Sequence, residues 1–467
     1  MPPIKLLISD TNTFVSYKKI IAILVGLALL FSIGIDMAAA QKKRQNLPLI
    51  RDAEIEGLLK DYTAPIFKAA GLGRNSVDIF IINRREFNAF VTGTRMFIFT
   101  GALTTAKTPN EIIGVIAHET GHLVGHHSVR MHEQLEKAKI MSVLGAILGA
   151  GAMITGGDGG GAAGSAILLG SQHAIRRSLL SYQRSEEMAA DNTAIKLLNK
   201  SGQSSRGMIK TFEGFARNEL FSSSSQNAYT RSHPLPRERI ALLKRLVAKS
   251  KYANKKDSPS LQLRHDMMRA KIAAYTGGAR AVRALFSKNL NGAPARYGDA
   301  ITTYLTGSPR RALPKINALI KQQPKNAYLY ELKGEMLLHS GKAAASIKPF
   351  KRAIKLDKYK SGLLRIQLGH AYLETNNPKL LVAAIKELKA GISRDRNSAD
   401  GYGHLARAYA RQGKTTLAIA ASAEEKYMQG KLKQAKNFAH RAQPKLKRGT
   451  PQWLRLQDIL DYKPIKG

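Results

Sequence analysis

Residues 108–130 read TPNEIIGVIAHETGHLVGHHSVR, and this stretch predicts a buried helix at the centre of a folded domain. Thr108, Pro109 and Glu111 mark its start, because a capping threonine, a proline at the first helical position and an acid three residues after the cap are typical of helix N-termini. Apolar residues occupy most of the helix surface, as expected of a helix enclosed by protein. We expect the helix to run to about Arg130.

The same helix carries a His-Glu-x-x-His pattern at residues 118–122. Residues four apart lie one turn apart on one face, so His118 and His122 suit two ligands of one tetrahedral zinc ion. Glu119 is rotated by about 100° from His118 and can take a proton from an attacking water as a general base. Such groups have no packing reason to interrupt an apolar helix, so the pattern predicts a zinc hydrolase.

A third ligand must come from elsewhere in the chain. The metzincin class requires a histidine at position 128, which is Ser128 here, so that class is excluded. His126 and His127 do not lie a whole turn from His122 on the ligand face, and we expect structural or surface roles for them. The chain contains no cysteine, which leaves a carboxylate as the remaining option.

An acidic pair in a basic protein is the best candidate. Glu187 and Asp191 are four residues apart in a helix predicted over residues 181–199, so both carboxylates face the same way. One can bind zinc while the other orients a ligand histidine. Glu186 is a competing ligand, but it lacks an acid four residues later. The alternative for each is a surface acid on a helix.

The N-terminal residues predict export from the cytoplasm. Lys18 and Lys19 precede an uncharged apolar run over residues 20–35, and small residues follow at Ala38 and Ala40. These features are typical of a cleaved signal peptide ending at Ala40. The alternative is an uncleaved N-terminal anchor, and in either case the body of the protein leaves the cytoplasm.

Three short runs before the central helix, residues 77–82, 88–92 and 96–100, are rich in β-branched and aromatic residues. They predict a small antiparallel sheet. If the second strand lies at an edge, it could pair with an extended peptide substrate; an interior position is the alternative.

Ten glycines fall among the thirty residues 141–170, between two apolar stretches. Such a composition cannot hold one stable helix, so we expect two short helices joined by a mobile loop. The segment could form a flap over the site that touches membrane or substrate, or it could be a plain linker.

The C-terminal half is repetitive. Turn residues recur at intervals of 34, 35 and 37, and each has a small residue seven positions earlier: Gly307, Gly341, Asn376 and Gly413 follow Ala300, Gly334, Gly369 and Ala406. This period is the tetratricopeptide (TPR) signature, although an unrelated helical bundle is an alternative. We therefore expect a mainly α protein with a signal peptide at 1–40, an α+β zincin-like metalloprotease domain at 41–255 and a TPR solenoid at 256–467.

The chain resembles the gluzincin peptidase family of HtpX, the CAAX prenyl protease and the periplasmic BepA-like proteases with C-terminal TPR repeats. The resemblance rests on the 118–122 motif, on Glu187-x-x-x-Asp191 and on the order of the domains. It implies that His118, His122 and Glu187 bind one zinc ion and that Glu119 is the general base.

The resemblance also implies roles for two further residues. Asp191 would support a zinc ligand, and His233, followed by Pro234, would stabilise the oxyanion or occupy the open coordination position. A His-Pro pair ahead of a helix is alternatively a simple helix entry.

The function implied is that of a periplasmic zinc endopeptidase in quality control of misassembled outer-membrane or envelope proteins, whose TPR repeats dock the outer-membrane assembly machinery. The alternative is a TPR chaperone or adaptor of outer-membrane assembly with a latent peptidase site.

The net charge of +41 is unusual for a folded protein. Strong positive charge attracts polyanions, yet the chain carries no recognisable nucleic-acid-binding motif. Peripheral contact with an anionic membrane is one interpretation, and a basic bias of the whole proteome is the other.

Overall fold

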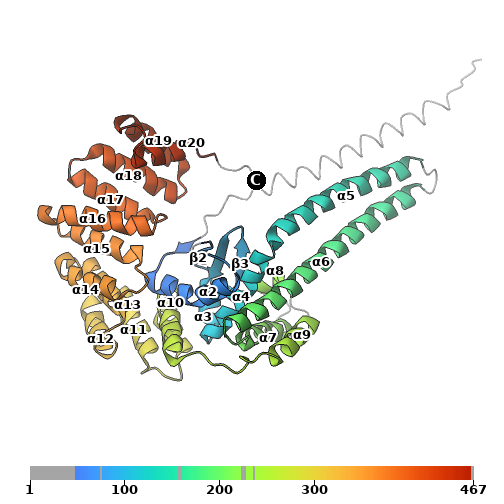
Figure 1. The fold of residues 1–467 in the computed structure, drawn as a ribbon, viewed down its shortest axis with the longest axis horizontal. Helices are drawn as coiled ribbons and strands as arrows, with labels where there is room; N and C mark the ends of the chain where they lie inside the picture. Colours follow the sequence, from blue (N-terminus) through green and yellow to red (C-terminus); the bar gives the residue numbers. More distant parts are fainter. Residues whose placement is uncertain (1–47, 74–75, 156–159, 222–227, 235–236, 464–467) are drawn as a thin grey trace, which may run out of the picture.

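The computed structural model describes residues 48–73, 76–155, 160–221, 228–234 and 237–463, so the predicted signal peptide lies outside the described residues. A small sheet surrounded by helices is followed by a solenoid of helix pairs, and a long helical hairpin projects from the opposite side (Figure 1). The expected mainly α architecture, with an α+β domain before the repeats, is confirmed. No described helix is both long and apolar enough to span a membrane.

The first part of the chain forms these elements: β1 (Leu49–Ile50), α2 (Ala53–Ala69), β2 (Asp78–Ile82), β3 (Ala89–Thr92), β4 (Arg95–Phe99), α3 (Thr100–Thr105), α4 (Pro109–Val124), α5 (His127–Thr155), α6 (Gly160–Lys200), α7 (Arg206–Phe221), α8 (Ala228–Ser232) and α9 (Arg237–Ala248).

The second part is helical: α10 (Pro259–Leu285), α11 (Ala293–Leu305), α12 (Pro309–Gln322), α13 (Ala327–His339), α14 (Ala343–Leu356), α15 (Gly362–Glu374), α16 (Pro378–Arg394), α17 (Ala399–Arg411), α18 (Thr415–Met428), α19 (Leu432–Ala442), the short 3-10 turn η2 (Gln443–Lys445) and α20 (Pro451–Asp461).

The sheet is mixed, so the expectation of an antiparallel sheet was wrong. Its strand order is β1-β2-β4-β3, and β2 pairs with β4 in parallel. The reason is that residues 83–88 carry the chain past β4 to the far edge, where β3 turns back onto β4 through Gly93 (φ 55°). Residues 83–88 therefore form a crossover connection rather than a hairpin turn. β3 lies at an edge of the sheet, next to α4.

Helix α4 lies at the centre of the first domain, and its residues from Pro109 to His122 are all buried. It packs against α2, α6, α7 and β3. The helix is shorter than expected, because the chain turns at Gly125 and His126, where the latter has a positive φ of 53°. A new helix, α5, begins at His127.

Helices α5 and α6 form a long antiparallel hairpin rather than the two short helices that were predicted. The helix predicted to start near Ser181 is the second half of α6, which begins at Gly160. Three of the glycines, Gly145, Gly149 and Gly164, lie where the two helices touch: a Cβ on Gly149 would be 2.9 Å from the carbonyl oxygen of Gly164. The predicted loop, at residues 156–159, lies outside the described residues.

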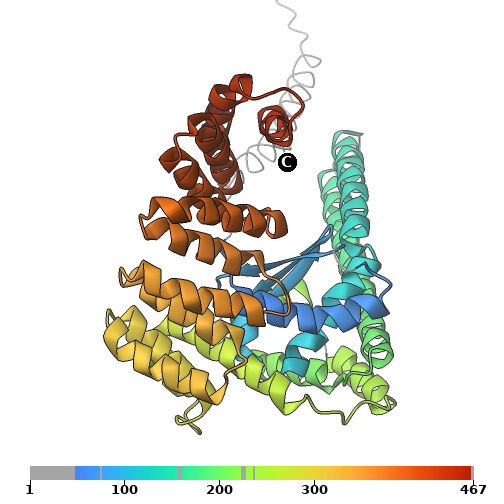
Figure 2. The same cartoon turned by 60° about the vertical axis from the view of Figure 1, so that its left-hand side comes forward.

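The TPR solenoid is confirmed, and Figure 2 shows its helix pairs stacked one on another. All four predicted turn residues have positive φ, from 54° at Asn376 to 79° at Gly307. The small residues lie where paired helices approach, as at Gly334, where a Cβ would be 2.8 Å from the ring of Phe350. Helix α18 pairs with both α17 and α19.

Helix α2 joins the two parts. Lys271 of α10 lies 2.7 Å from Asp52 and 3.2 Å from Glu54, while Tyr297 of α11 donates a hydrogen bond of 2.9 Å to Glu54. Asp61, two helical turns after Glu54, pairs with Arg264. These contacts fix the first TPR helices against the sheet domain.

Candidate metal centre

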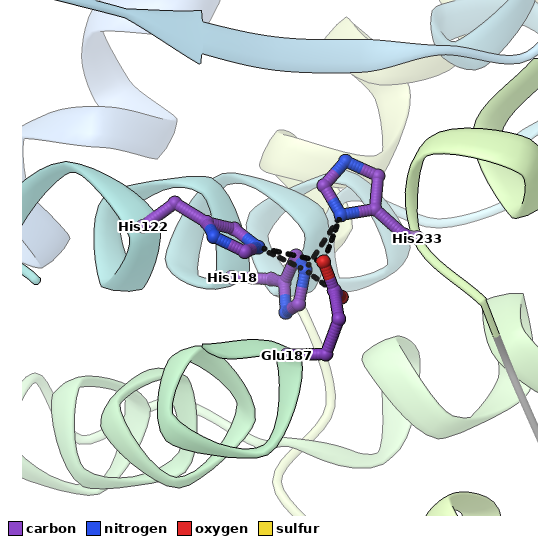
Figure 3. A group of neighbouring side chains, drawn as sticks. All are labelled: His118, His122, Glu187 and His233. Carbon is purple, nitrogen blue, oxygen red and sulfur yellow. Dashed lines mark hydrogen bonds and ion pairs between the residues drawn. The ribbon is translucent and has the colours of Figure 1, made fainter. Parts of the chain in front are cut away.

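Four buried side chains from three segments point toward one another: His118 and His122 of α4, Glu187 of α6, and His233 just after α8 (Figure 3). One ligand-type atom from each lies within 4.8 Å of all the others. The buried face of α4 therefore meets a carboxylate and a third imidazole that are distant in sequence.

The separations fit a tetrahedral metal ion. The Nε2 atoms of His118 and His122 are 3.1 Å apart, and the Glu187 carboxylate oxygens lie 3.3 Å from the first and 3.4 Å from the second. Ligand bonds of about 2.0–2.2 Å in a tetrahedron place ligand atoms about 3.3–3.6 Å apart. Two imidazoles and one carboxylate are also a donor set that zinc takes in catalytic sites.

Glu119 lies beside this group and is 1% exposed. Neither of its carboxylate oxygens has a hydrogen-bond partner among the described residues, and Nε2 of the His233 imidazole lies 3.5 Å from Oε1. Burial raises the pKa of the Glu119 carboxyl. A buried carboxylate without donors is costly, so its position suits a group whose partners are the metal and a water.

Asp191 contacts the opposite side of the His118 ring. Its Oδ1 lies 2.9 Å from Nδ1 of His118, an arrangement that would direct Nε2 of that ring to a metal ion. Arg239 of α9 donates two hydrogen bonds to Asp191, of 2.5 and 2.8 Å, and also lies 2.9 Å from Glu187. Burial alone would raise the pKa of Asp191, but the Arg239 guanidinium lowers it.

The His122 ring has a comparable support. Nδ1 of His127 lies 2.8 Å from Nδ1 of His122, and Nε2 of His127 lies 3.0 Å from Glu186, which also accepts a hydrogen bond from Arg130. A surface role for His127 is therefore wrong. Glu186 lies outside the group of four, against His127.

Two features of this site escaped sequence reasoning. His127 contacts His122 because the chain breaks at Gly125, and a continuous helix was assumed there. Only its position, five residues after Pro234, could have indicated a role for Arg239 in the site. Its side chain donates to the Pro234 carbonyl at 2.8 Å, so it fixes the turn that carries His233.

Comparison with known proteins agrees with this geometry. Residues 51–247 match the model of peptidase family M48, and residues 306–361 match a tetratricopeptide repeat model. Residues 51–247 are an M48 peptidase domain. The expected resemblance is thereby confirmed, and so is the assignment of the chain as a metalloendopeptidase.

Curated relatives cover most of this M48 protein. The beta-barrel assembly-enhancing protease of Yersinia pestis is 25% identical over 432 residues, which are 90% of this chain and 86% of that protein. The protein of the same name from Escherichia coli K12 is 24% identical, over 90% of this chain and 85% of its own length. Metalloprotease YcaL of the same strain is 27% identical over 40% of this chain and 70% of its own.

Glu187→Gln and Glu186→Gln separate a ligand from a supporting residue. We expect Glu187→Gln to lose the metal during dialysis against a weak chelator, because it removes a charged ligand. Glu186→Gln should lower metal affinity by about tenfold at most, since it acts only through His127. Metal content by mass spectrometry checks this, and equal losses in the two variants would contradict the assignment.

Gly121→Ala tests the packing beneath the ligands. A Cβ at Gly121 would lie 2.6 Å from the Ala190 carbonyl oxygen of α6, so α4 and α6 must move apart. We expect weaker metal binding, by about tenfold or more, although no ligand is altered. Gly151→Ala, whose Cβ would meet nothing within 4 Å, is the control. Unchanged affinity in Gly121→Ala would show that this close approach is not needed.

Proposed function

We propose that this M48 metallopeptidase is a periplasmic zinc endopeptidase that cleaves misassembled outer-membrane or envelope proteins. The observation that carries the proposal is the convergence of His118, His122 and Glu187 beside the buried carboxylate of Glu119, whose oxygens accept no hydrogen bond from the described residues. This combination supplies a metal-binding set and a general base within one water-excluded site.

Each residue has a distinct task in peptide hydrolysis. His118, His122 and Glu187 would hold the zinc ion, whose Lewis acidity, when it is bound, polarises a carbonyl and lowers the pKa of water. Glu119 takes the proton of the attacking water and returns it to the departing amine nitrogen.

The supporting residues keep the histidine rings in the required orientation. Asp191 lies 2.9 Å from Nδ1 of His118, and Arg239 holds Asp191 in place. His127 does the equivalent at Nδ1 of His122. With their Nδ1 atoms engaged, both rings present Nε2 to the metal.

His233 favours a second interpretation, in which the peptidase is latent. Its Nδ1 lies 2.9 Å from Glu187 and 3.4 Å from Nε2 of His118, so the ring stands within the ligand group. A ring in this position would take the open coordination place that a substrate carbonyl needs; after displacement it could stabilise the oxyanion. The chain would then serve mainly as a TPR chaperone or adaptor until substrate displaces His233.

Strand β3 offers a place for the substrate chain. It is an edge strand next to α4. In its antiparallel pairing with β4, the Phe99 N–H donates a hydrogen bond to the Asn88 carbonyl, so these two residues form a hydrogen-bonded pair. The alternate residues, Ala89 and Val91, therefore direct their backbone groups away from the sheet. An extended peptide that pairs there would lie along α4, beside the metal centre.

Compartment and partners follow from the relatives and from the N-terminus. Relatives named for enhancing beta-barrel assembly align with 90% of this chain. A predicted signal peptide at residues 1–40 would deliver the protein to the periplasm. We propose that the TPR repeats dock the outer-membrane assembly machinery, since stacked helix pairs provide extended protein-binding surfaces.

Glu119→Gln separates the protease from the adaptor. We expect it to retain zinc but to lower kcat for an unfolded-protein substrate by about 100-fold or more, because the general base is lost. In a deletion strain the variant should fail to restore envelope quality control. Full rescue by Glu119→Gln would refute the protease proposal and support the adaptor.

Val91→Pro tests substrate pairing at β3. Proline removes an outward N–H donor, so we expect kcat/KM for an extended peptide to fall by about fivefold to tenfold, from one lost hydrogen bond. Val91→Ala retains the N–H and serves as the control. Similar losses in both variants would indicate a side-chain contact and contradict backbone pairing.

A further inference from the structure

The outer part of the α5–α6 hairpin presents large apolar side chains to solvent. Of the 20 large hydrophobic residues exposed in the described part of the chain, nine lie between Ile140 and Leu169. Ile147 and Leu148 are 61% and 64% exposed. An apolar surface of this extent marks a contact with another protein or with a membrane.

Small and large apolar residues are distributed in the hairpin in the opposite way from a helix pair in water. Its seam contains small residues: Gly145, Gly149 and Gly164 are buried, and a Cβ on Gly164 would lie 2.4 Å from the Gly149 carbonyl oxygen. In water, large apolar residues would fill such a seam. Small residues between helices and large ones outside are typical of helices surrounded by lipid.

Charge is distributed to match a lipid interface. Between Lys139 and Arg176 the sequence contains one charged residue, Asp158. Gly145 of α5 lies opposite Ser171 of α6. Because the two helices are antiparallel, Lys139, six residues before Gly145, is level with Arg177, six residues after Ser171. Lys137 and Arg176 are exposed nearby, while Glu136 pairs with Lys139 at 2.6 Å.

We propose that the apolar outer parts of α5 and α6, residues 140–155 and 161–169 (the hairpin tip), insert into an anionic lipid bilayer, with Lys137, Lys139, Arg176 and Arg177 against the headgroups. The apolar part of α5, from Ile140 to Thr155, is about 24 Å long, shorter than a hydrocarbon core of about 30 Å. The tip thus enters the bilayer without crossing it. Away from their ends, α5 and α6 satisfy their backbone groups within each helix, as lipid requires.

Insertion would fix the height of the metal centre. Glu187 lies ten residues beyond Arg177 on the same helix, which places it about 15 Å from the headgroup level. The peptidase would therefore act on chains held near the membrane surface. This inference concerns binding, and it stands whether or not the site cleaves.

Vesicle flotation tests the inference on chains that begin at Gln41, so that the apolar run 20–35 cannot contribute. We expect the wild-type chain to float with phosphatidylglycerol-containing vesicles, less at high salt, and poorly with phosphatidylcholine alone. Ile147→Asn with Leu148→Asn should lower partitioning by about tenfold or more, since inserted aliphatic side chains contribute at least that much each.

Matched variants make the result specific. Val382→Asn with Leu454→Asn removes two apolar side chains that are 67% and 50% exposed elsewhere, and should float as wild type does. Flotation of the tip variant equal to this control would overturn the inference. If that variant floated normally but no longer bound an unfolded outer-membrane protein, the tip would be a protein-docking surface instead.

Two further variants test the charge and the depth. Arg176→Gln with Arg177→Gln should weaken flotation and flatten its salt dependence, whereas the charge-matched pair Lys288→Gln with Arg310→Gln should not. Trp453 is the single tryptophan of the chain. With Trp453→Phe, a tryptophan introduced by Ile147→Trp should be quenched by brominated lipid tails, and absence of quenching would refute insertion. Glu119→Gln should float normally, which keeps this test separate from that of catalysis.

Discussion

Asp191 and Arg239 form a buried ion pair on which the arrangement of the metal centre depends. The aspartate lies against Nδ1 of His118 on α4, and the arginine reaches Glu187 on α6 and the Pro234 carbonyl beside His233. A buried charge is costly unless it is paired, so none of these groups can move without exposing another to an unfavourable environment. One polar network thereby fixes residues from α4, α6 and the α8–α9 turn in a common orientation.

This network can form only because the helices approach closely. Gly121 brings α4 to within contact of the α6 backbone at Ala190, and Gly114 does the same for α7 at Met208. Larger side chains at these positions would separate the helices and carry Glu187 away from the histidines. The glycine inside the His-Glu-x-x-His motif therefore has a packing role as well as its place between ligands.

Helix α6 connects chemistry to location. It carries Glu187 and Asp191 at one end and reaches the apolar hairpin tip at the other. The TPR helices lie on the opposite side of the sheet, held through α2 by Lys271 and its acidic partners (Figure 1). The metal centre thus lies between a repeat surface suited to partner proteins and a hairpin suited to lipid. A substrate chain that pairs with β3 would be accessible from both.

Several features could be predicted from local patterns alone. The spacing of His118 and His122, the acidic pair at Glu187 and the recurring turn glycines each follow from helical periodicity or a positive φ, which depend on neighbours in sequence. The mixed strand order, the break after Val124 and the contacts of His127 and Arg239 depend on residues far apart in the chain. Tertiary packing decided them, because close backbone approach and the pairing of buried charges are properties of the assembled core. The sequence by itself determined which groups could bind a metal, and only the fold decided which histidine and which arginine would support them.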